Sequence, residues 1–256
     1  MNNFPPFRAK QLYHWMYRHG INETNEMNNI PKEMSELLSQ EYQFKTLQVE
    51  EIQSSEKENT KKILFKTHDN RLIESVSMID KNLHTICISS QVGCSVDCQF
   101  CATGEMGFMR SLSCGEIIDQ FIEITKIREE PITNVVYMGM GEPLLNFSNL
   151  ISSIDKISSK NGLSISTKRI TVSTVGVPKI IKKMADMNVN FNLAVSLHSA
   201  IQKKREMVMP FSNKIDLDEL SKMALKDPST SGNPKKLSLE DIKKLYEFSI
   251  EGKTFE

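Results

Sequence analysis

Residues 94–101 have the sequence Cys-Ser-Val-Asp-Cys-Gln-Phe-Cys, which places three thiols in one short segment, those of Cys94, Cys98 and Cys101. Four cysteine thiolates are the usual ligands of a four-iron four-sulfur cluster. Three thiols at C-x3-C-x2-C spacing therefore predict a cluster in which one iron has no protein ligand. That open iron is a place where a small molecule could bind and react.

A structural zinc site is the alternative interpretation of these three thiols. Zinc prefers a closed shell of four ligands, so a fourth would have to come from elsewhere, for example from His84, Cys114 or His198. Such sites usually contain two C-x2-C pairs, and this chain has no second pair. The spacing favours the cluster and leaves zinc open.

The composition is typical of a globular protein. The chain has 256 residues, of which 39% are apolar and 25% charged, enough for one α/β unit with a small additional domain. No stretch is long and apolar enough to span a membrane, and the first residues lack the apolar segment of a secretion signal. The five cysteines are odd in number and crowded, which is typical of a reducing compartment. We expect a cytoplasmic protein with no membrane partner.

The charge pattern does not by itself identify a partner. The formal net charge is zero, so bulk electrostatics give no sign of nucleic-acid binding. Basic side chains cluster at Lys168-Arg169, at Lys179 with Lys182-Lys183, and at Lys203-Lys204-Arg205. Such clusters can contact phosphates, but most are solvated faces of helices, and the latter is the default interpretation.

Residues 1–80 are predicted to form an N-terminal accessory domain. Apolar residues at helical spacing indicate helices between about Phe7 and Tyr42. The polar stretch from Gln53 to Lys62 is predicted as a turn, and the runs Lys62 to Lys66 and Leu72 to Ile79 are predicted as strands.

Residues 81–225 alternate between strand and helix patterns. Strands are predicted at 85–89, 133–138, 169–174 and 191–197, with helices between them that begin near Ser113, Asn146 and Pro178. Glu116 follows Ser113 by three residues and predicts a capping box. This alternation predicts a parallel sheet whose functional groups gather at the carboxyl ends of the strands.

The remaining C-terminal part has a weaker pattern. A short helix is predicted from Leu217 to Leu225. Residues 226–256 are predicted as a linker, rich in Ser, Gly and Pro, followed by one capped helix from about Ser238 to Phe248.

Polar groups follow the predicted strands at their carboxyl ends. The second predicted strand is followed directly by Gly139-Met-Gly141-Glu142-Pro143. The glycines allow the backbone to approach a ligand closely, and Glu142 can accept hydrogen bonds from an ammonium group. Ser173 ends the third strand, and Ser196-Leu197-His198 follows the fourth. Taken alone, these are also ordinary turns and strand caps.

The cysteine segment, with Phe100 before its last thiol, resembles the signature of the radical S-adenosylmethionine (SAM) enzymes. Four further segments, which occur in the same order as in one family of these enzymes, make the resemblance more specific. They are Phe7-Arg-Ala-Lys-Gln-Leu, Ser89-Ser-Gln-Val-Gly-Cys94, residues 133–145 and Ser196-Leu-His198. Together they resemble the RlmN family of RNA adenine-C2 methyltransferases, whose relatives, the Cfr enzymes, methylate carbon 8. The match runs from about Phe7 to about Leu220.

This resemblance implies a fold, cofactors and partners. The expected fold is α/β, a partial (β/α)6 radical SAM barrel behind an N-terminal RNA-binding domain. The expected cofactors are a [4Fe-4S] cluster on Cys94, Cys98 and Cys101, and SAM. Gly141, Glu142, Ser173, Ser196, Leu197 and His198 would bind SAM, with Glu142 on its amino group. The expected partners are 23S ribosomal RNA, transfer RNA and a reductant such as flavodoxin.

The family chemistry also implies roles for two further residues, Cys87 and Glu74. Carbon 2 of adenine is electron-poor, so the family first methylates a C-terminal cysteine and then adds the derived methylene radical to the base. Cys87 matches the cysteine that resolves the resulting protein–RNA crosslink. Glu74 matches the base that removes the ring proton. Without the resemblance, a strand cysteine and a solvated carboxylate would be the ordinary interpretations.

The sequence departs from the family at its end. No cysteine follows Cys114, so the methyl-carrying residue is missing, and the last barrel strands are not predicted. We therefore expect a truncated member that lacks autonomous activity and self-associates through open barrel edges. The alternatives are a radical SAM enzyme that acts on another substrate and a non-catalytic RNA-binding remnant.

Overall fold

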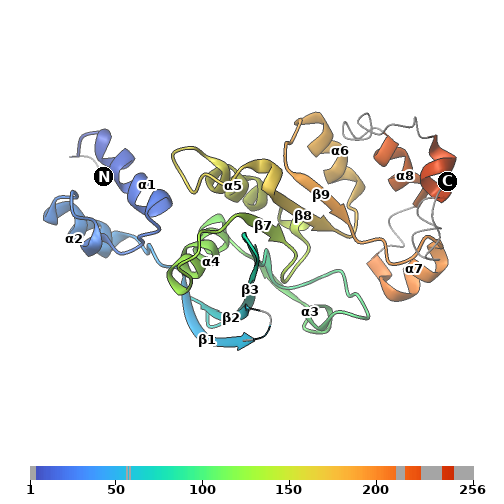
Figure 1. The fold of residues 1–256 in the computed structure, drawn as a ribbon, viewed down its shortest axis with the longest axis horizontal. Helices are drawn as coiled ribbons and strands as arrows, with labels where there is room; N and C mark the ends of the chain where they lie inside the picture. Colours follow the sequence, from blue (N-terminus) through green and yellow to red (C-terminus); the bar gives the residue numbers. More distant parts are fainter. Residues whose placement is uncertain (1–3, 56, 58, 212–216, 226–237, 245–256) are drawn as a thin grey trace.

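A seven-stranded sheet forms the centre of the computed structural model, which describes residues 4–55, 57, 59–211, 217–225 and 238–244 (Figure 1). The strand order is β1-β2-β3-β4-β7-β8-β9. Its strands are β1 (Leu47–Ser55), β2 (Thr60–Thr67), β3 (Leu72–Asp80), β4 (Leu83–Cys87), β7 (Asn134–Tyr137), β8 (Ile170–Thr174) and β9 (Asn192–Val195). The first four are antiparallel, and β4, β7, β8 and β9 are parallel.

Helices connect the parallel strands, as the alternating pattern predicts. They are α4 (Cys114–Ile127), α5 (Phe147–Ser158), preceded by η2 (Pro143–Asn146), and α6 (Pro178–Asp186). A short η3 (Thr167–Arg169) leads into β8. The chain thus has the α/β architecture expected of a partial barrel, with four parallel strands among the described residues.

One face of the sheet is buried under these helices. Side chains alternate between the two faces along each strand, and Ile63, Phe65, Ile73, Ile86, Val135, Ile170 and Val172 share one core with apolar residues of α4, α5 and α6. The side chains of the other face are only partly buried. We call this second face the open face, and it includes Lys62, Leu64, Glu74, Val76, Cys87, Val136 and Ser173.

The N-terminal helices form a second, smaller core. Helix α1 (Phe7–Arg18), η1 (Thr24–Glu26) and α2 (Lys32–Glu41) surround Met27, Ile30, Met34 and Leu38. Polar contacts attach this unit to α4: Asn22 Nδ2 donates to Glu123 Oε1 at 3.1 Å, and Lys126 Nζ donates to Asn22 Oδ1 at 2.7 Å. The helices therefore form a separate core that is tied to the sheet at defined points.

The β part of the predicted accessory region belongs to the main sheet. Strands β1 to β3 continue it, and β3 pairs with β4 from Val76–Cys87 to Asp80–Leu83. The boundary predicted near residue 80 therefore lies between two hydrogen-bonded strands. The turn between strands that is predicted from Gln53 to Lys62 is shorter than expected, because β1 extends to Ser55 and β2 begins at Thr60. Polar composition was misleading there because most of β1 is exposed.

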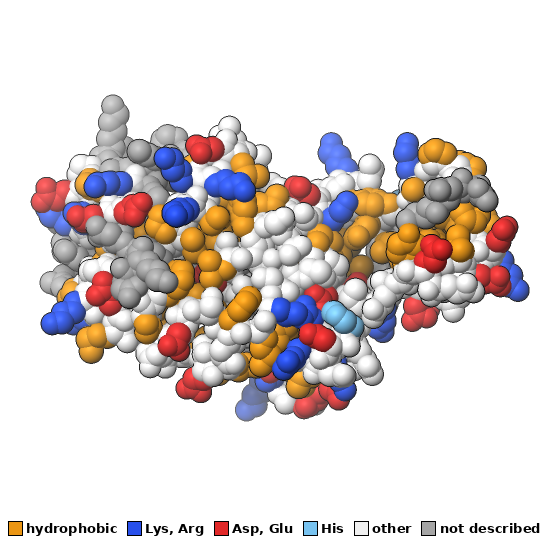
Figure 2. All heavy atoms as spheres, turned by 180° about the vertical axis from the view of Figure 1, so that it is seen from behind, with side chains coloured by type: hydrophobic (Ala, Val, Ile, Leu, Met, Phe, Trp, Pro, Cys, Tyr) orange, Lys and Arg blue, Asp and Glu red, His pale blue; other side chains and the backbone are white. Residues whose placement is uncertain are grey.

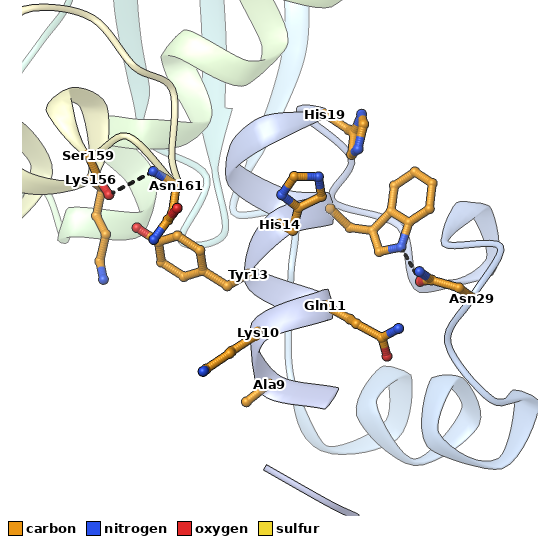
Figure 3. Close-up of a pocket in the computed structure, with 11 residues that line it drawn as sticks. Ala9, Lys10, Gln11, Tyr13, His14, His19, Asn29, Lys156, Ser159 and Asn161 are labelled. Carbon is orange, nitrogen blue, oxygen red and sulfur yellow. Dashed lines mark hydrogen bonds between the residues drawn. The ribbon is translucent and has the colours of Figure 1, made fainter. Parts of the chain in front are cut away.

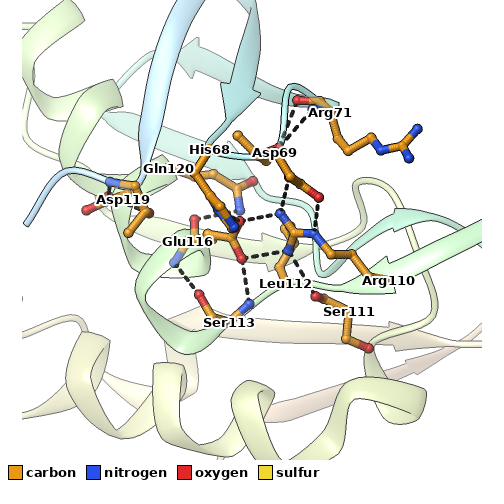
Figure 4. Close-up of polar contacts among 12 residues, drawn as sticks. His68, Asp69, Arg71, Arg110, Ser111, Leu112, Ser113, Glu116, Asp119 and Gln120 are labelled. Carbon is orange, nitrogen blue, oxygen red and sulfur yellow. Dashed lines mark hydrogen bonds and ion pairs between the residues drawn. The ribbon is translucent and has the colours of Figure 1, made fainter. Parts of the chain in front are cut away.

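A polar cluster joins the β2–β3 turn to the core (Figure 4). Arg110, in β6 (Phe108–Ser111), donates to Asp69 at 2.8 and 2.9 Å and to Glu116 at 2.7 and 2.9 Å. Glu116 also completes the predicted capping box of α4 with Ser113. We call Asp69, Arg110 and Glu116 the clasp, since Arg110 bridges two carboxylates from distant parts of the chain.

The C-terminal part of the described chain packs beside the cysteine segment. It contains α7 (Gln202–Val208), α8 (Leu217–Leu225) and a helical stretch at 239–244. The predicted linker at 226–237 and the end of the last helix lie outside the described residues. None of the described helices has the length and apolar character needed to cross a membrane.

Candidate functional site

The three cluster cysteines lie on one loop between β5 (Gln91–Gly93) and α3 (Ala102–Glu105). Backbone hydrogen bonds fix this loop, from Cys94 N to Gly107 O at 3.1 Å and from Cys101 N to Cys98 O at 3.0 Å. Gly93 enters it with a φ of +72°, and a Cβ there would lie 1.8 Å from Gly107 O. Only glycine fits this position, so the backbone that presents Cys94 is set by sequence.

The thiols of this loop lie close enough to influence one another electrostatically. Burial raises the pKa of Cys98 to about 11, and the neighbouring Cys94 and Cys101 add to the shift. Burial likewise raises the pKa of Cys94. Within the described residues, no three His, Cys, Asp or Glu side chains are placed to hold one metal ion. The ligands of a single zinc ion converge on one point, whereas the ligands of a cluster bind separate irons and need not do so.

His198 contacts the cysteine loop through a ring contact. Its imidazole lies 4.2 Å from the ring of Phe100, centroid to centroid. The backbone of His198 has a φ of +56°, which non-glycine residues seldom adopt. Burial lowers the pKa of His198, with a smaller contribution from Arg205, so the ring is neutral at pH 7. The contact brings the segment after β9 against the predicted cluster site.

Glu142 is buried at the carboxyl end of β7, next to the predicted Gly-Glu-Pro turn. Its carboxylate accepts hydrogen bonds from Thr174 Oγ1 at 2.7 Å, Val175 N at 2.9 Å and Leu144 N at 3.0 Å. Burial raises its pKa, and these bonds oppose the rise. The carboxylate therefore holds the ends of β7 and β8 together, and its remaining acceptor capacity points to one more donor.

The turn before Glu142 is built on Gly141. This residue has a φ of +96°, and a Cβ on it would lie 2.4 Å from the Cβ of Gln91. Gln91 Oε1 accepts from the backbone N–H of Glu142 at 2.9 Å. Sequence reasoning missed Gln91, whose position three residues before Cys94 was the available signal.

Ser173 and Ser196 meet at the adjacent strand ends. Their hydroxyl oxygens are 3.3 Å apart, although the residues are 23 positions apart in sequence. Leu197 takes part through its carbonyl, which accepts from Ser199 N at 2.7 Å and from Arg205 Nε at 3.2 Å. The structure therefore brings the predicted SAM-binding residues to the carboxyl ends of the parallel strands.

Cys87 and Glu74 both lie on the open face. Cys87 pairs with Val76 across β3 and β4, and Glu74 is two residues from Val76, so the two side chains project on the same side. In such a diagonal arrangement the two residues are about 7–8 Å apart, and their Cβ atoms are somewhat closer. Lys62 Nζ holds the Glu74 carboxylate at 3.0 Å. Burial raises the pKa of the Cys87 thiol to about 11, so it is protonated at pH 7.

Arg205 does not belong to a solvated basic cluster, which corrects the expectation from Lys203-Lys204-Arg205. Its side chain is fully buried, while Lys203 and Lys204 are exposed. Nothing in the sequence distinguishes Arg205 from its neighbours, because three adjacent basic residues on a seven-residue helix differ only in the direction each one faces.

Two family models match the chain. "Radical SAM superfamily" matches residues 88–224, and "Ribosomal RNA large subunit methyltransferase N-terminal domain" matches residues 3–44. The second match ends just before β1, where the separate helical core also ends.

Curated relatives named "Probable dual-specificity RNA methyltransferase RlmN" are similar over most of the chain. The one from Flavobacterium johnsoniae is 44% identical over 223 residues, which are 86% of this chain and 64% of the relative. The one from Cytophaga hutchinsonii is 39% identical, with 95% and 70% covered. The chain thus spans 64% of the length of the first relatives it matches.

A solved structure has the same fold. The radical SAM methyltransferase from Sphaerobacter thermophilus matches with a TM-score of 0.85 and 32% identity. The match covers 91% of this chain and 69% of that one.

Proposed function

The chain belongs to the RlmN family of the radical SAM superfamily, and from this premise we propose that it forms the catalytic core of a radical SAM enzyme that methylates carbon 2 of adenine in RNA. The observation that carries this proposal is the placement of Cys87 and Glu74 on the open face of the sheet whose parallel strands are followed, at their carboxyl ends, by Glu142 and the Ser173–Ser196 pair.

The residues present fit the cofactors that the superfamily implies, a [4Fe-4S] cluster and SAM. Three thiols on one fixed loop would hold the cluster, and Glu142, with spare acceptor capacity, would accept from the SAM ammonium group. The Ser173 and Ser196 hydroxyls, Gly141, Leu197 and His198 would line the rest of the SAM site. When bound, the cluster would supply one electron to the sulfonium of SAM, and cleavage of a sulfur–carbon bond of SAM would yield methionine and a carbon-centred radical.

Cys87 and Glu74 would act after the carbon–carbon bond to adenine has formed. Glu74 would remove the proton from carbon 2, and Lys62 would orient its carboxylate. Cys87 would then attack the bridging sulfur of the crosslink and form a disulfide with the methyl-carrying cysteine, while the bond from that sulfur to the methylene carbon breaks and this carbon takes up a proton to become the methyl group. Its raised pKa means that the thiol must lose its proton on approach to that sulfur, since little thiolate exists beforehand.

RNA would contact the groove between α1 and the end of α5 (Figure 3). This groove has a volume of about 890 Å³, and its wall includes Lys10, His14, Trp15, His19 and Lys156. Aromatic faces stack with unpaired bases, and lysines contact phosphates. The groove supplies a local basic, aromatic surface, whereas acids and bases are interspersed over the face in Figure 2.

The remaining partners follow from this proposal. The RNA would be 23S ribosomal RNA and transfer RNA, encountered in the cytoplasm, and a low-potential protein such as flavodoxin would supply electrons. The methyl-carrying cysteine must come from outside these residues, because none follows Cys114.

The test uses unmodified 23S ribosomal RNA and transfer RNA with SAM and reductant. We expect no 2-methyladenosine by mass spectrometry from the 256-residue chain alone, and its appearance when a C-terminal segment of a full-length relative is added. Glu74→Gln and Cys87→Ser should each abolish the product in the supplemented reaction, while Glu50→Gln, which removes an exposed carboxylate on β1, should not. Product from the supplemented Cys87→Ser variant at the unsubstituted rate would refute the assigned role.

A radical SAM reaction on another substrate is the second candidate. It would use the same cysteine loop but need neither Cys87 nor Glu74. Cleavage of SAM that is unaffected by RNA, together with no methylated base in the supplemented reaction, would favour it.

A further inference from the structure

Arg205 is a buried cation whose charge has no partner among the described residues. Its Nη2 donates to Val175 O at 2.6 Å and its Nε to Leu197 O at 3.2 Å. Its Nη1 is buried and has no hydrogen-bond partner in the described part of the chain. No ion pair with Arg205 forms there either. Isolated buried charges are costly, so an unpaired guanidinium calls for an explanation.

The guanidinium lies beside the cysteine loop. It is close enough to the Cys98 thiol for an electrostatic interaction. Helix α7, which carries Arg205, is bound to the loop by a hydrogen bond from Gln99 N to Val208 O at 2.9 Å. Met209, directly after α7, packs in one apolar cluster with Cys94 and Cys98. The cation is therefore fixed against the residues that would hold the cluster.

Nearby groups do not account for the charge. Glu206 acts on Arg205 only at a distance, and its carboxylate accepts from Gln202 Nε2 at 2.7 Å. The two carbonyls that Arg205 binds could be satisfied equally well by a neutral donor such as an amide. Joining the ends of β8 and β9 therefore does not by itself require the positive charge of Arg205, which points to a second role for that charge.

We propose that Arg205 is a positioning residue for the cluster and that its fixed, buried positive charge beside the cysteine loop stabilises the reduced form of the cluster and raises its reduction potential. This inference rests on the proposed cofactor. A cluster held by three thiolates is anionic, and reduction adds one more negative charge. Net charge and hydrogen bonds to sulfur are the main protein influences on cluster potential, and burial keeps the charge from being screened by solvent.

The test compares variants at two neighbouring positions on α7. Arg205→Gln removes the charge but keeps amide donors for the two carbonyls, and Arg205→Lys keeps the charge. Lys204→Gln is the matched control, since it removes an exposed charge one residue away. Each protein is reconstituted without oxygen, its iron and labile sulfide are measured, and its potential is determined without SAM by titration with dithionite under electron paramagnetic resonance.

We expect Arg205→Gln to lower the ratio of reduced to oxidised cluster at fixed potential about tenfold, which is about 59 mV for a one-electron couple. Arg205→Lys and Lys204→Gln should each change the ratio less than about twofold. An unchanged potential in a fully loaded Arg205→Gln protein would overturn the proposal, as would equal shifts in the Gln and Lys variants.

Control measurements distinguish a failure of this inference from misfolding of a variant and from a failure of the proposed function. Circular dichroism identifies a variant that does not fold, in which case Arg205→Met replaces Arg205→Gln, because an apolar side chain of similar length can replace a buried charge. Failure of the unsubstituted protein to bind iron and sulfide would refute the cofactor assignment itself. A normal cluster with no effect of Arg205 would refute only the present inference.

Discussion

At the scale of single residues, Glu142 combines a structural and a binding role. Its carboxylate holds two strand ends, yet it is the group proposed to bind the SAM ammonium. We expect Glu142→Ala to retain iron and to weaken SAM binding by about 1.5–3 kcal/mol, the usual contribution of a hydrogen bond to a charged group. Calorimetric titration of the anaerobic protein with SAM measures this.

Thr174→Val is the control for Glu142. It removes one donor to the carboxylate but leaves the carboxylate in place. If both variants lose SAM affinity equally, the effect comes from loss of the strand connection. Unchanged affinity in Glu142→Ala would remove Glu142 from the SAM site.

Cys87 should react slowly with alkylating reagents at neutral pH. Burial raises its pKa to about 11, so about one thiol in a thousand is ionised at pH 8. Only the thiolate reacts, and the rate of iodoacetamide labelling should therefore rise steadily up to about pH 11. Peptide mass spectrometry follows Cys87, with free glutathione as the reference. A labelling rate that levels off below pH 9 would contradict the burial that the structure gives this thiol.

At the scale of elements, the clasp connects the β2–β3 turn to α4 and is sensitive to pH. Hydrogen bonds from Arg110 and Thr67 hold the pKa of Asp69 well below its ordinary value of 3.8. Burial alone would raise the pKa of Glu116, but bonds from Arg110 and Ser113 lower it below 4.5. A carboxyl group whose pKa is lowered by folding stabilises the folded state at pH values above its ordinary, unfolded-state pKa. This contribution is lost as the pH falls from that value through the pKa of the folded state.

We expect Arg110→Met to reduce the free energy of unfolding by about 2 kcal/mol at pH 7, because Glu116 is left buried without its cation. The difference between the variant and the unsubstituted protein should shrink as pH falls below about 4. Urea unfolding at several pH values measures it. Lys61→Met, at a partly buried position of β2 outside the clasp, is the control. A difference that is constant down to pH 3 would show that the clasp carboxylates are not responsible.

Much of this arrangement could be predicted from sequence, for physical reasons that differ between elements. The capping box at Ser113 and Glu116 is local chemistry, and the structure forms it. The parallel strands β7 and β8 contain short apolar runs, which predict buried strands, and the structure buries one face of each. Strand β1 was missed because it is exposed and polar, and β-strand preference depends on neighbours that a sequence does not show. Gln91 and Arg205 were missed because their roles depend on contacts 51 and 30 residues away.

At the scale of the whole molecule, the described sheet has two edges, at β1 and β9. Strand β9 is short and carries Val195 at 38% exposure. Free edges and exposed apolar side chains favour association between chains. We expect the 256-residue chain to self-associate, and Val195→Lys to reduce this, since a charge on an edge strand opposes pairing.

Sedimentation velocity at several concentrations tests the association. Lys61→Met, away from β9, should leave the sedimentation profile unchanged. A chain that is monomeric at all concentrations, or one whose association Val195→Lys does not alter, would show that the β9 edge is not the contact.

An open iron in a cluster held by Cys94, Cys98 and Cys101 is the central feature of the proposed function. The direct measurement is iron and labile sulfide analysis of the anaerobic protein, followed by electron paramagnetic resonance of the reduced form with and without SAM. We predict four irons and four sulfides per chain, a spectrum that changes when SAM binds, and loss of the cluster on changing any one of the three cysteines to serine. Stoichiometric zinc without sulfide, or a cluster spectrum that SAM leaves unchanged, would contradict it.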